Sequence, residues 1–194
     1  MKIVLAALLG AVAMFLWEFV AHMFTPLGDA GMGYLPNETV VSPALASALG
    51  KQSGLYIFPT GGLTKDSSKE EMEQGMNRML EEMKTKPSGL VLYKPPGTEF
   101  HFGKNLAVQF LTDFAKALLA VLLLAQTRLT TFGSRVGFVV LVGAVAAIAT
   151  NIPLWNWYGF PVVFTLAYVV MEILSFFFAG LAIALIWKRS PASV

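Results

Sequence analysis

Four long apolar runs alternate with polar segments along this chain of 194 residues. They cover residues 3–24, 106–126, 136–152 and 162–187. Each run holds about 17 to 26 residues, which is enough for a helix to cross a bilayer, the last one with tilt. The pattern predicts a membrane all-α fold: a four-transmembrane-helix bundle with a small α+β domain inserted between helices 1 and 2.

The predicted organisation has three parts. Residues 1–24 form transmembrane helix 1, and residues 105–194 form helices 2–4 with a C-terminal tail. Residues 25–104 have the composition of a soluble segment and form the inserted domain. Lys2 and Ala11-Val12-Ala13 resemble the start and cleavage site of a signal peptide, but the apolar run continues past them. We therefore expect an uncleaved signal anchor.

Turn and capping residues divide the inserted segment into four predicted elements. Asn37 or Ser42 suits the start of a first helix, and Gly50 suits its end. Asp66, Ser67 or Ser68 suits the start of a second helix with acidic residues in its first turn. The predicted helices cover residues 38–49 and 69–84, and two strands that we expect to pair cover residues 54–59 and 89–93.

The second of these helices has an apolar face rich in methionine, made of Met72, Met76, Met79, Leu80 and Met83. Such a face is typical of a helix that packs against a sheet or a partner. The alternative is a copper(I) site, which methionine sulfur favours. No histidine or cysteine accompanies these methionines, and the whole chain lacks cysteine, so thiolate metal sites and disulfides are excluded.

Two features are predicted for the outer half of the bundle. Gly143, Ala147 and Asn151 recur every four residues, which permits close helix packing with an amide at the outer end. Residues 153–161 contain two prolines and a glycine and predict a tight hairpin. Its aromatic side chains belong at the membrane interface.

Charge is distributed unevenly between the two ends of the helices. The basic residues at one end are Lys2, Arg128, Arg135, Lys188 and Arg189, whereas residues 153–160 carry no charge. The positive-inside rule places both termini in the cytoplasm and residues 25–104 outside, in a bacterial inner (cytoplasmic) membrane. The net charge of +2 is too small to indicate nucleic-acid binding. The expected partners are the lipid bilayer and either a protein partner or further copies of the chain.

Five ionisable residues interrupt the apolar helices in their outer half or at their centre. They are Glu18, His22, Asp113, Lys116 and Glu172, with Gln109 and Asn151 as possible support. A rise of about 1.5 Å per residue places them at similar depths on three helices. Charged side chains facing lipid cost about 2.5 kcal/mol or more each. We therefore expect one polar cluster in the bundle interior.

The predicted cluster has more acidic than basic groups, since three carboxylates accompany one lysine and one titratable histidine. With all carboxylates ionised and His22 neutral it would carry a charge of −2. Protonated carboxyls, a bound cation or a water-filled crevice would relieve this excess. Three roles stay open: helix-pinning pairs, a path for protons, ions or cationic ligands, and a metal site formed by Glu18, His22, Asp113 and Glu172.

Several short segments together resemble a group of bacterial four-helix integral membrane proteins with no assigned activity. The matching segments are Ala21-His22-Met23, Pro26-Leu27-Gly28, Leu35-Pro36-Asn37-Glu38, Gly54-Leu55-Tyr56-Ile57-Phe58-Pro59 and Trp155-Asn156-Trp157-Tyr158-Gly159-Phe160-Pro161. The resemblance covers most of the chain. It implies a bacterial source and the same topology, and it implies nothing about mechanism.

No catalytic motif is recognisable: the chain has no Ser-His-Asp pattern, phosphate-binding glycine loop, HExxH or GxSxG. The sequence therefore favours a non-enzymatic membrane protein without a cofactor, an accessory or scaffolding subunit that engages a partner through its extracytoplasmic domain. The alternatives are a small proton- or ion-coupled transporter or channel that uses the carboxylate cluster, and a membrane metal-binding protein.

Overall fold

The computed structural model describes residues 1–187 and divides into two units. One unit contains Met1–Gly33 and the chain from His101 onward, and the other contains Tyr34–Phe100. The first unit is built from α1 (Lys2–Phe24), α4 (Phe102–Ala125), α5 (Phe132–Tyr158) and α6 (Val162–Ile186). All four helices are long and apolar enough to cross a membrane, as the sequence predicts, and they are compatible with a helical membrane bundle.

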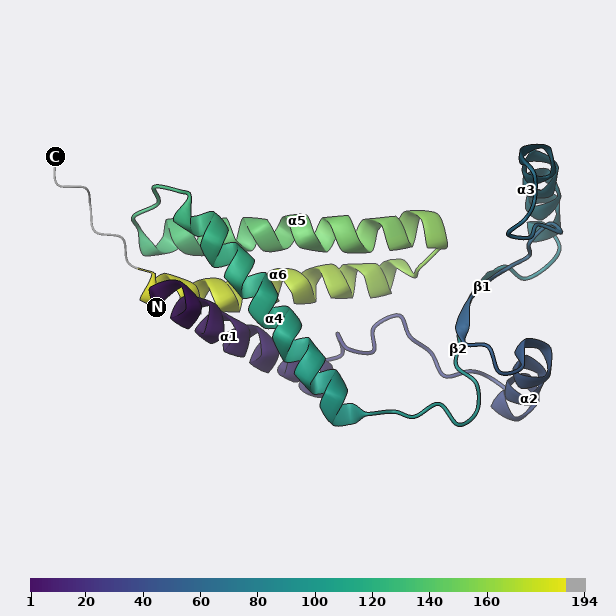
Figure 1. Ribbon diagram of the computed structural model, residues 1–194, viewed down its shortest axis with the longest axis horizontal. Helices are drawn as coiled ribbons and strands as arrows, with labels where there is room; N and C mark the ends of the chain where they lie inside the picture. The colour runs from purple at the N-terminus through teal and green to yellow at the C-terminus, as the bar shows by residue number, and fades with distance from the viewer. Residues whose placement is uncertain (188–194) are drawn as a thin grey trace. The chain divides into compact units, whose positions relative to one another are not determined.

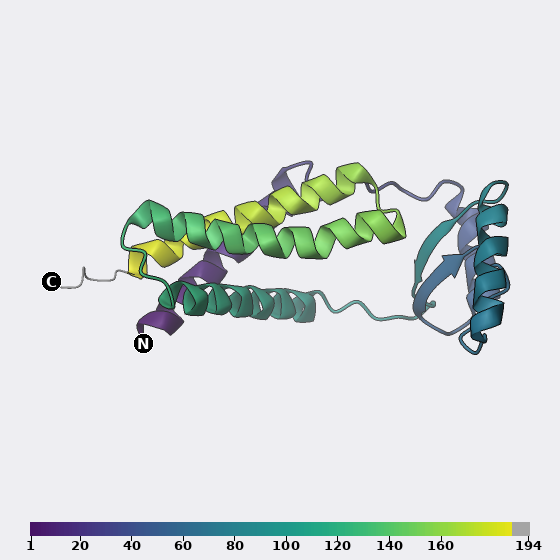
Figure 2. The same cartoon turned by 90° about the horizontal axis from the view of Figure 1, so that it is seen from above.

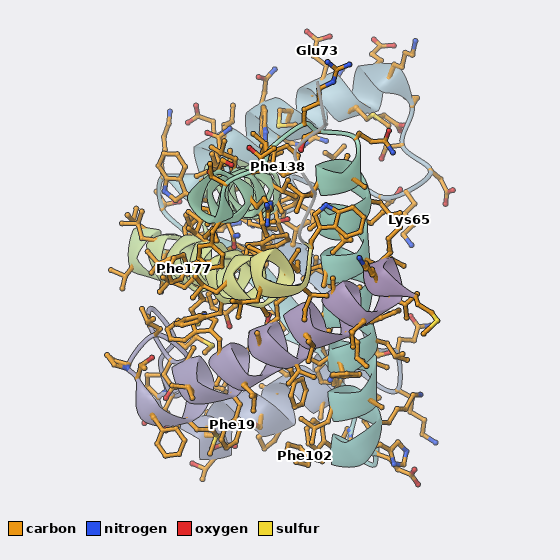
Figure 3. The ribbon with its side chains drawn as sticks, turned by 90° about the vertical axis from the view of Figure 1, so that its left-hand side faces the viewer. Phe19, Lys65, Glu73, Phe102, Phe138 and Phe177 are labelled. Carbon is orange, nitrogen blue, oxygen red and sulfur yellow. The ribbon has the colours of Figure 1, made fainter. Side chains whose placement is uncertain are left out.

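The four long helices pack in a chain of neighbours. α5 lies beside α6, α6 packs on α1, and α1 packs on α4, whereas α4 touches α5 and α6 only slightly (Figures 1 and 2). The buried core comes mainly from small and aliphatic side chains of α1, α4 and α6, such as Met14, Val121 and Ile183. Large aromatic side chains, among them Phe19 and Phe177, lie on the outside of the bundle (Figure 3). That surface suits contact with lipid.

The turn that follows α1 belongs to the bundle. Thr25 ends the helix, and its hydroxyl donates to the carbonyl of Ala21 at 2.6 Å. At Gly31, φ is +75° and a Cβ atom would lie 2.7 Å from the backbone nitrogen of Phe164 on α6. Only glycine allows this approach. The inserted unit therefore starts at Tyr34 in the structure, later than the predicted boundary at residue 25.

Helix α5 is longer than predicted, and the expected hairpin over residues 153–161 is wrong. Pro153 lies inside the helix, which continues to Tyr158 and ends at Gly159 in the left-handed conformation, with φ of 70°. Apolar membrane-spanning helices tolerate proline, because neighbouring groups and local adjustments satisfy the freed carbonyl. The stop signal is therefore Gly159, and the connection to α6 is only three residues long, 159–161.

Arg135, expected only as a flanking charge, is buried at the start of α5. Its guanidinium donates to the carbonyls of Leu129, at 3.5 Å, and Ala184, at 3.3 Å, and also to that of Thr130. It therefore joins the 126–131 connection to the last turns of α6. A cation is favourable there, because the last carbonyls of a helix carry partial negative charge.

Arg135→Met is expected to lower the free energy of unfolding by about 2 kcal/mol, since hydrogen bonds from a charged donor are lost and a buried carbonyl is left without a partner. Thermal unfolding in detergent micelles would measure the change. Arg128→Met is the matched control, because Arg128 is exposed in the same connection. Equal melting temperatures for the two variants would contradict the role assigned to Arg135.

The inserted unit has two helices and two strands at the predicted places. They are α2 (Glu38–Leu49), β1 (Gly54–Phe58), α3 (Lys69–Met83) and β2 (Gly89–Tyr93). The strands pair antiparallel, with Leu55 opposite Leu92 and Ile57 opposite Leu90. Within residues 34–100, which are all described, these two strands form the whole sheet. A two-stranded sheet on its own has only marginal stability in water.

Helix α3 packs against the loop that precedes it. A Cβ atom at Gly61 would lie 2.1 Å from the carbonyl oxygen of Gly75, so the two backbones touch at glycine. Leu63 covers Gly75, and Nε of Arg78 donates to the carbonyl of Gly61 at 2.8 Å. This contact uses the Gly75 side of the helix. Met79 lies next to this contact and is partly buried, whereas Met72, Met76 and Met83 stay about half exposed.

A capping box starts α3, with Ser68 as the cap among the three predicted candidates. The backbone N–H of Ser68 donates to Oε2 of Glu71 at 2.7 Å, and the Ser68 hydroxyl accepts from the N–H of Glu71 at 3.3 Å. These hydrogen bonds lower the pKa of Glu71. A lowered pKa in the folded state stabilises the helix start above the unfolded pKa, and the effect disappears as the pH falls through the folded pKa.

Acidification is therefore expected to loosen the first turn of α3. Amide hydrogen exchange of residues 69–72 would increase as the pH falls below the usual range of glutamate, about 4.3, after correction for intrinsic exchange rates. Glu71→Gln is expected to remove this pH dependence, and Glu81→Gln, near the other end of the helix, is expected to leave it. Unchanged pH dependence in Glu71→Gln would contradict the assignment.

Candidate functional site

Lys116 is the centre of the polar cluster in the bundle. Its Nζ lies 3.1 Å from Oδ1 of Asp113 on the same helix, 3.2 Å from Oε1 of Glu18 on α1, and 3.4 Å from Oε1 of Glu172 on α6. The ammonium also lies 5.9 Å from the ring centre of Phe176. One cation therefore joins three helices, and it links α4 to α6 where these helices otherwise touch little.

Gln109 joins two of the carboxylates from one turn before Asp113. Its Nε2 donates to Oε2 of Glu18 at 2.6 Å and to Oδ1 of Asp113 at 3.2 Å. The spacing of four residues between Gln109 and Asp113 puts both side chains on one face of α4. The structure thus brings together Glu18, Asp113, Lys116, Glu172 and Gln109 from the predicted set; we call these residues, with Ser175, the intramembrane cluster.

Ser175 is the member of the intramembrane cluster that was not predicted. It is fully buried on α6, and its hydroxyl donates to Oε1 of Glu18 at 3.1 Å. Nearby, Nε1 of Trp17 donates to the carbonyl of Met171 at 3.0 Å and joins α1 to α6. The signal for Ser175 is its position three residues after Glu172, because this spacing puts two polar groups on one face of an otherwise apolar helix.

His22 and Asn151 do not contact the cluster side chains, and their predicted places are wrong. Nδ1 of His22 lies 2.9 Å from the main-chain carbonyl of Glu18, and its ring, which is exposed, meets the ring of Tyr168. Nδ2 of Asn151 donates to the carbonyl of Ala147 at 2.9 Å. Both side chains therefore bond to the carbonyl four residues earlier in their own helix, a local alternative to contacts between helices.

The intramembrane cluster does not have the arrangement of a metal site. Among residues 1–187, no three histidine, aspartate or glutamate side chains are placed so that they could hold a metal ion. The physical reason is that the Lys116 ammonium lies among the three carboxylates, and that a ring nitrogen of His22 bonds to a main-chain carbonyl. The alternative of a metal site at Glu18, His22, Asp113 and Glu172 is therefore contradicted within the described residues.

The cluster is partly accessible at its surface and closed at Asp113. The side chains of Glu18, Lys116 and Glu172 are 17%, 22% and 26% exposed, whereas Asp113 is 0% exposed. Oδ2 of Asp113 is the one buried side-chain nitrogen or oxygen atom without a hydrogen-bond partner in the described part of the chain. With every carboxyl ionised, the cluster carries three negative charges and one positive charge, a net −2.

The inserted unit presents a second candidate site, an apolar surface on α3 and the sheet. The side chains on α3 are each about half exposed, from 46% to 52%: Met72, Met76, Leu80 and Met83. On the sheet, Leu55, Ile57 and Leu92 are 62%, 57% and 74% exposed. A groove of about 570 Å³ lies between α2 and β2, with Leu45, Val91 and Tyr93 among its lining residues.

This unit buries very little of its apolar content. Within residues 34–100, all of them described, Tyr93 is the only hydrophobic side chain classed as buried, at 7% exposure. Its hydroxyl donates to the carbonyl of Gly50 at 2.9 Å. Large exposed apolar surfaces on a folded unit are typical of protein–protein or membrane contact.

Comparisons of the chain with protein-family models, with curated proteins and with solved structures give no match. The functional assignment therefore depends on the chain's own residues and their geometry.

Proposed function

We propose that this chain is a non-enzymatic, multi-pass membrane protein that acts as an accessory or scaffolding subunit and engages a protein partner through residues 34–100. The observation that carries the proposal is that the inserted unit lacks a buried core. Its methionine face and the sheet side chains Leu55, Ile57 and Leu92 are exposed instead. A small unit of this kind gains stability when a partner covers its apolar surface.

The charges on α3 indicate the chemistry of the partner. The helix contains five glutamates, at positions 70, 71, 73, 81 and 82, against Lys69 and Arg78, a net charge of −3. Flexible methionines next to acidic residues suit an apolar strip that is flanked by lysine or arginine. Electrostatics is less favourable toward an anionic lipid surface, which repels the glutamates. The proposed partner is therefore a protein surface with an apolar strip and a basic rim.

The proposed location follows the basic residues. In the structure the N-terminus, the α4–α5 connection and the end of α6 lie together at one end of the bundle (Figure 1). Lys2 and Arg128 belong to that end. Under the positive-inside rule it is cytoplasmic, and residues 34–100 are on the outer side of a bacterial inner membrane. Lys188 and Arg189, which support the same orientation in the sequence, lie outside the described residues.

Site-specific photo-cross-linking in native membranes tests partner binding. A photoreactive amino acid in place of Met76 is expected to give a discrete adduct whose partner is identified by mass spectrometry. The matched control is Asn77, which is also exposed on α3 but lies outside the methionine face, so an adduct there should be absent. Met76→Glu should weaken co-purification of the same partner, and Gln74→Glu should not. Leu55 on the exposed sheet is a second position for the photoreactive amino acid. The proposal is refuted if the chain purifies without any protein partner and gives no adduct at Met76 or at Leu55.

A second candidate function is favoured by the intramembrane cluster: a small proton- or ion-coupled transporter or channel. Ionisable side chains inside a membrane bundle commonly mark ion or proton pathways. The test is a flux assay with the purified chain in liposomes. Flux that is lost in Glu172→Gln and Asp113→Asn supports transport, and flux that these variants leave unchanged assigns the cluster to structure alone.

A further inference from the structure

We propose that Asp113 holds an exchangeable proton, which makes the intramembrane cluster a proton-binding site. The chemical step is a proton transfer from hydronium to one carboxylate oxygen: an O–H bond of hydronium breaks, an O–H bond on the carboxyl group forms, and a water molecule is released. The inference is independent of the binding surface on residues 34–100, and it holds whether or not the chain transports anything.

The charge balance of the cluster is the first argument. Among residues 1–187, Lys116 is the one cation in contact with Glu18, Asp113 and Glu172. On α1, the ring nitrogen of His22 bonds to a main-chain carbonyl and not to one of these carboxylates. On α5, the buried Arg135 is bonded to carbonyls of Leu129, Thr130 and Ala184. A net charge of −2 in a poorly solvated place is costly, and a bound proton reduces it.

The hydrogen bonds show which carboxyl takes the proton. Glu18 accepts from three donors, Gln109, Lys116 and Ser175, so its negative charge is well compensated. Glu172 contacts Lys116 and is 26% exposed at the surface of the bundle, so the protein does not enclose its carboxylate. Asp113 accepts from Gln109 and Lys116, but both donors reach the same oxygen atom, Oδ1. Asp113 is completely buried, and its Oδ2 has no hydrogen-bond partner.

The surroundings of Asp113 also allow the proton to exchange. Oδ1 of Asp113 touches Lys116, and Lys116 touches two carboxylates that are partly exposed, Glu18 and Glu172. Asp113 is therefore two contacts away from carboxylates at the surface of the bundle. A chain of hydrogen-bonding side chains of this kind can move a proton between the surface and a buried group.

Infrared spectroscopy of the full chain in lipid nanodiscs tests the proposal without altering any residue. A neutral carboxylic acid has a C=O stretch that is absent from ionised carboxylates. We expect this band at neutral pH, and we expect it to decrease reversibly as the pH is raised. ¹³C-aspartate should shift the band and ¹³C-glutamate should not. The chain has only two other aspartates, Asp29 and Asp66.

Variants provide the second arm of the test. Asp113→Asn is expected to abolish the band, and Asp66→Asn, in the exposed loop before α3, should leave it unchanged. The proposal is overturned by a missing band at neutral pH, by a band that only ¹³C-glutamate shifts, or by a band that does not titrate before the protein unfolds. If Asp113→Asn fails to fold, the labelled wild-type chain still decides between these results.

Discussion

Lys116→Met is expected to destabilise the bundle by about 3 kcal/mol, because it removes the cation that three carboxyl groups share and leaves the negative charges of Glu18 and Glu172 uncompensated. The three contacts at 3.1–3.4 Å disappear together, and so does the contact of the ammonium with the Phe176 ring. The methionine side chain fills a similar volume and is apolar. The loss of stability therefore measures the missing positive charge and not an empty cavity. Thermal unfolding in detergent micelles would measure it.

The control for this prediction is Lys104→Met, because Lys104 is exposed near the start of the same helix. It is expected to melt like the wild type. Adding Glu18→Gln or Glu172→Gln to Lys116→Met should recover part of the stability, since each change removes one uncompensated negative charge. Similar melting temperatures for Lys116→Met and Lys104→Met would show that the ion pairs contribute little to the bundle.

The local elements of this fold were predictable because local signals determine them. Long apolar runs gave the four bundle helices, and capping and turn residues such as Ser68 and Gly50 gave the elements of the inserted unit. The end of α5 was predicted too early because Pro153 was expected to terminate the helix. In an apolar helix a proline is tolerated near the end, and the left-handed Gly159 terminates the helix instead.

The composition of the cluster was only partly predictable, for a geometric reason. Counting residues along a helix gives the depth of a side chain but not the partner that it chooses. Similar depths predicted that Glu18, Asp113 and Lys116 lie in one cluster, and in the structure Lys116 contacts both carboxyl groups. The prediction also included His22 and Asn151, whose side chains bond to carbonyls of their own helices. A polar side chain in a helix always has that local alternative, and the sequence does not show which bond forms.

The methionine face of α3 illustrates a different limit. Periodicity shows that a helix has an apolar face, and it is silent about what covers that face. The contact between Gly61 and Gly75 brings the preceding loop next to Met79, and Met72, Met76 and Met83 stay about half exposed.

Close packing between α5 and α6 depends on Gly143. A Cβ atom at this position would lie 2.4 Å from Cβ and 2.5 Å from Cγ of Phe176, which is itself almost fully buried on α6. The contact is with the root of the aromatic side chain, so a change of rotamer cannot relieve it easily. Small residues at such contacts let membrane helices approach closely.

Gly143→Leu is therefore expected to lower the free energy of unfolding by about 3 kcal/mol, because it overpacks a filled contact and forces α5 away from α6. Gly143→Ala should cause a smaller loss of the same sign. Thermal unfolding in micelles measures both, and Gly137→Leu is the control, since a Cβ atom at Gly137 on the same helix meets nothing within 4 Å.

Because Phe176 also touches the Lys116 ammonium, displacement of Phe176 should disturb the intramembrane cluster as well. Combining Gly143→Leu with Lys116→Met should then cost less than the sum of the two single changes. Strict additivity would show that the helix contact and the cluster are independent.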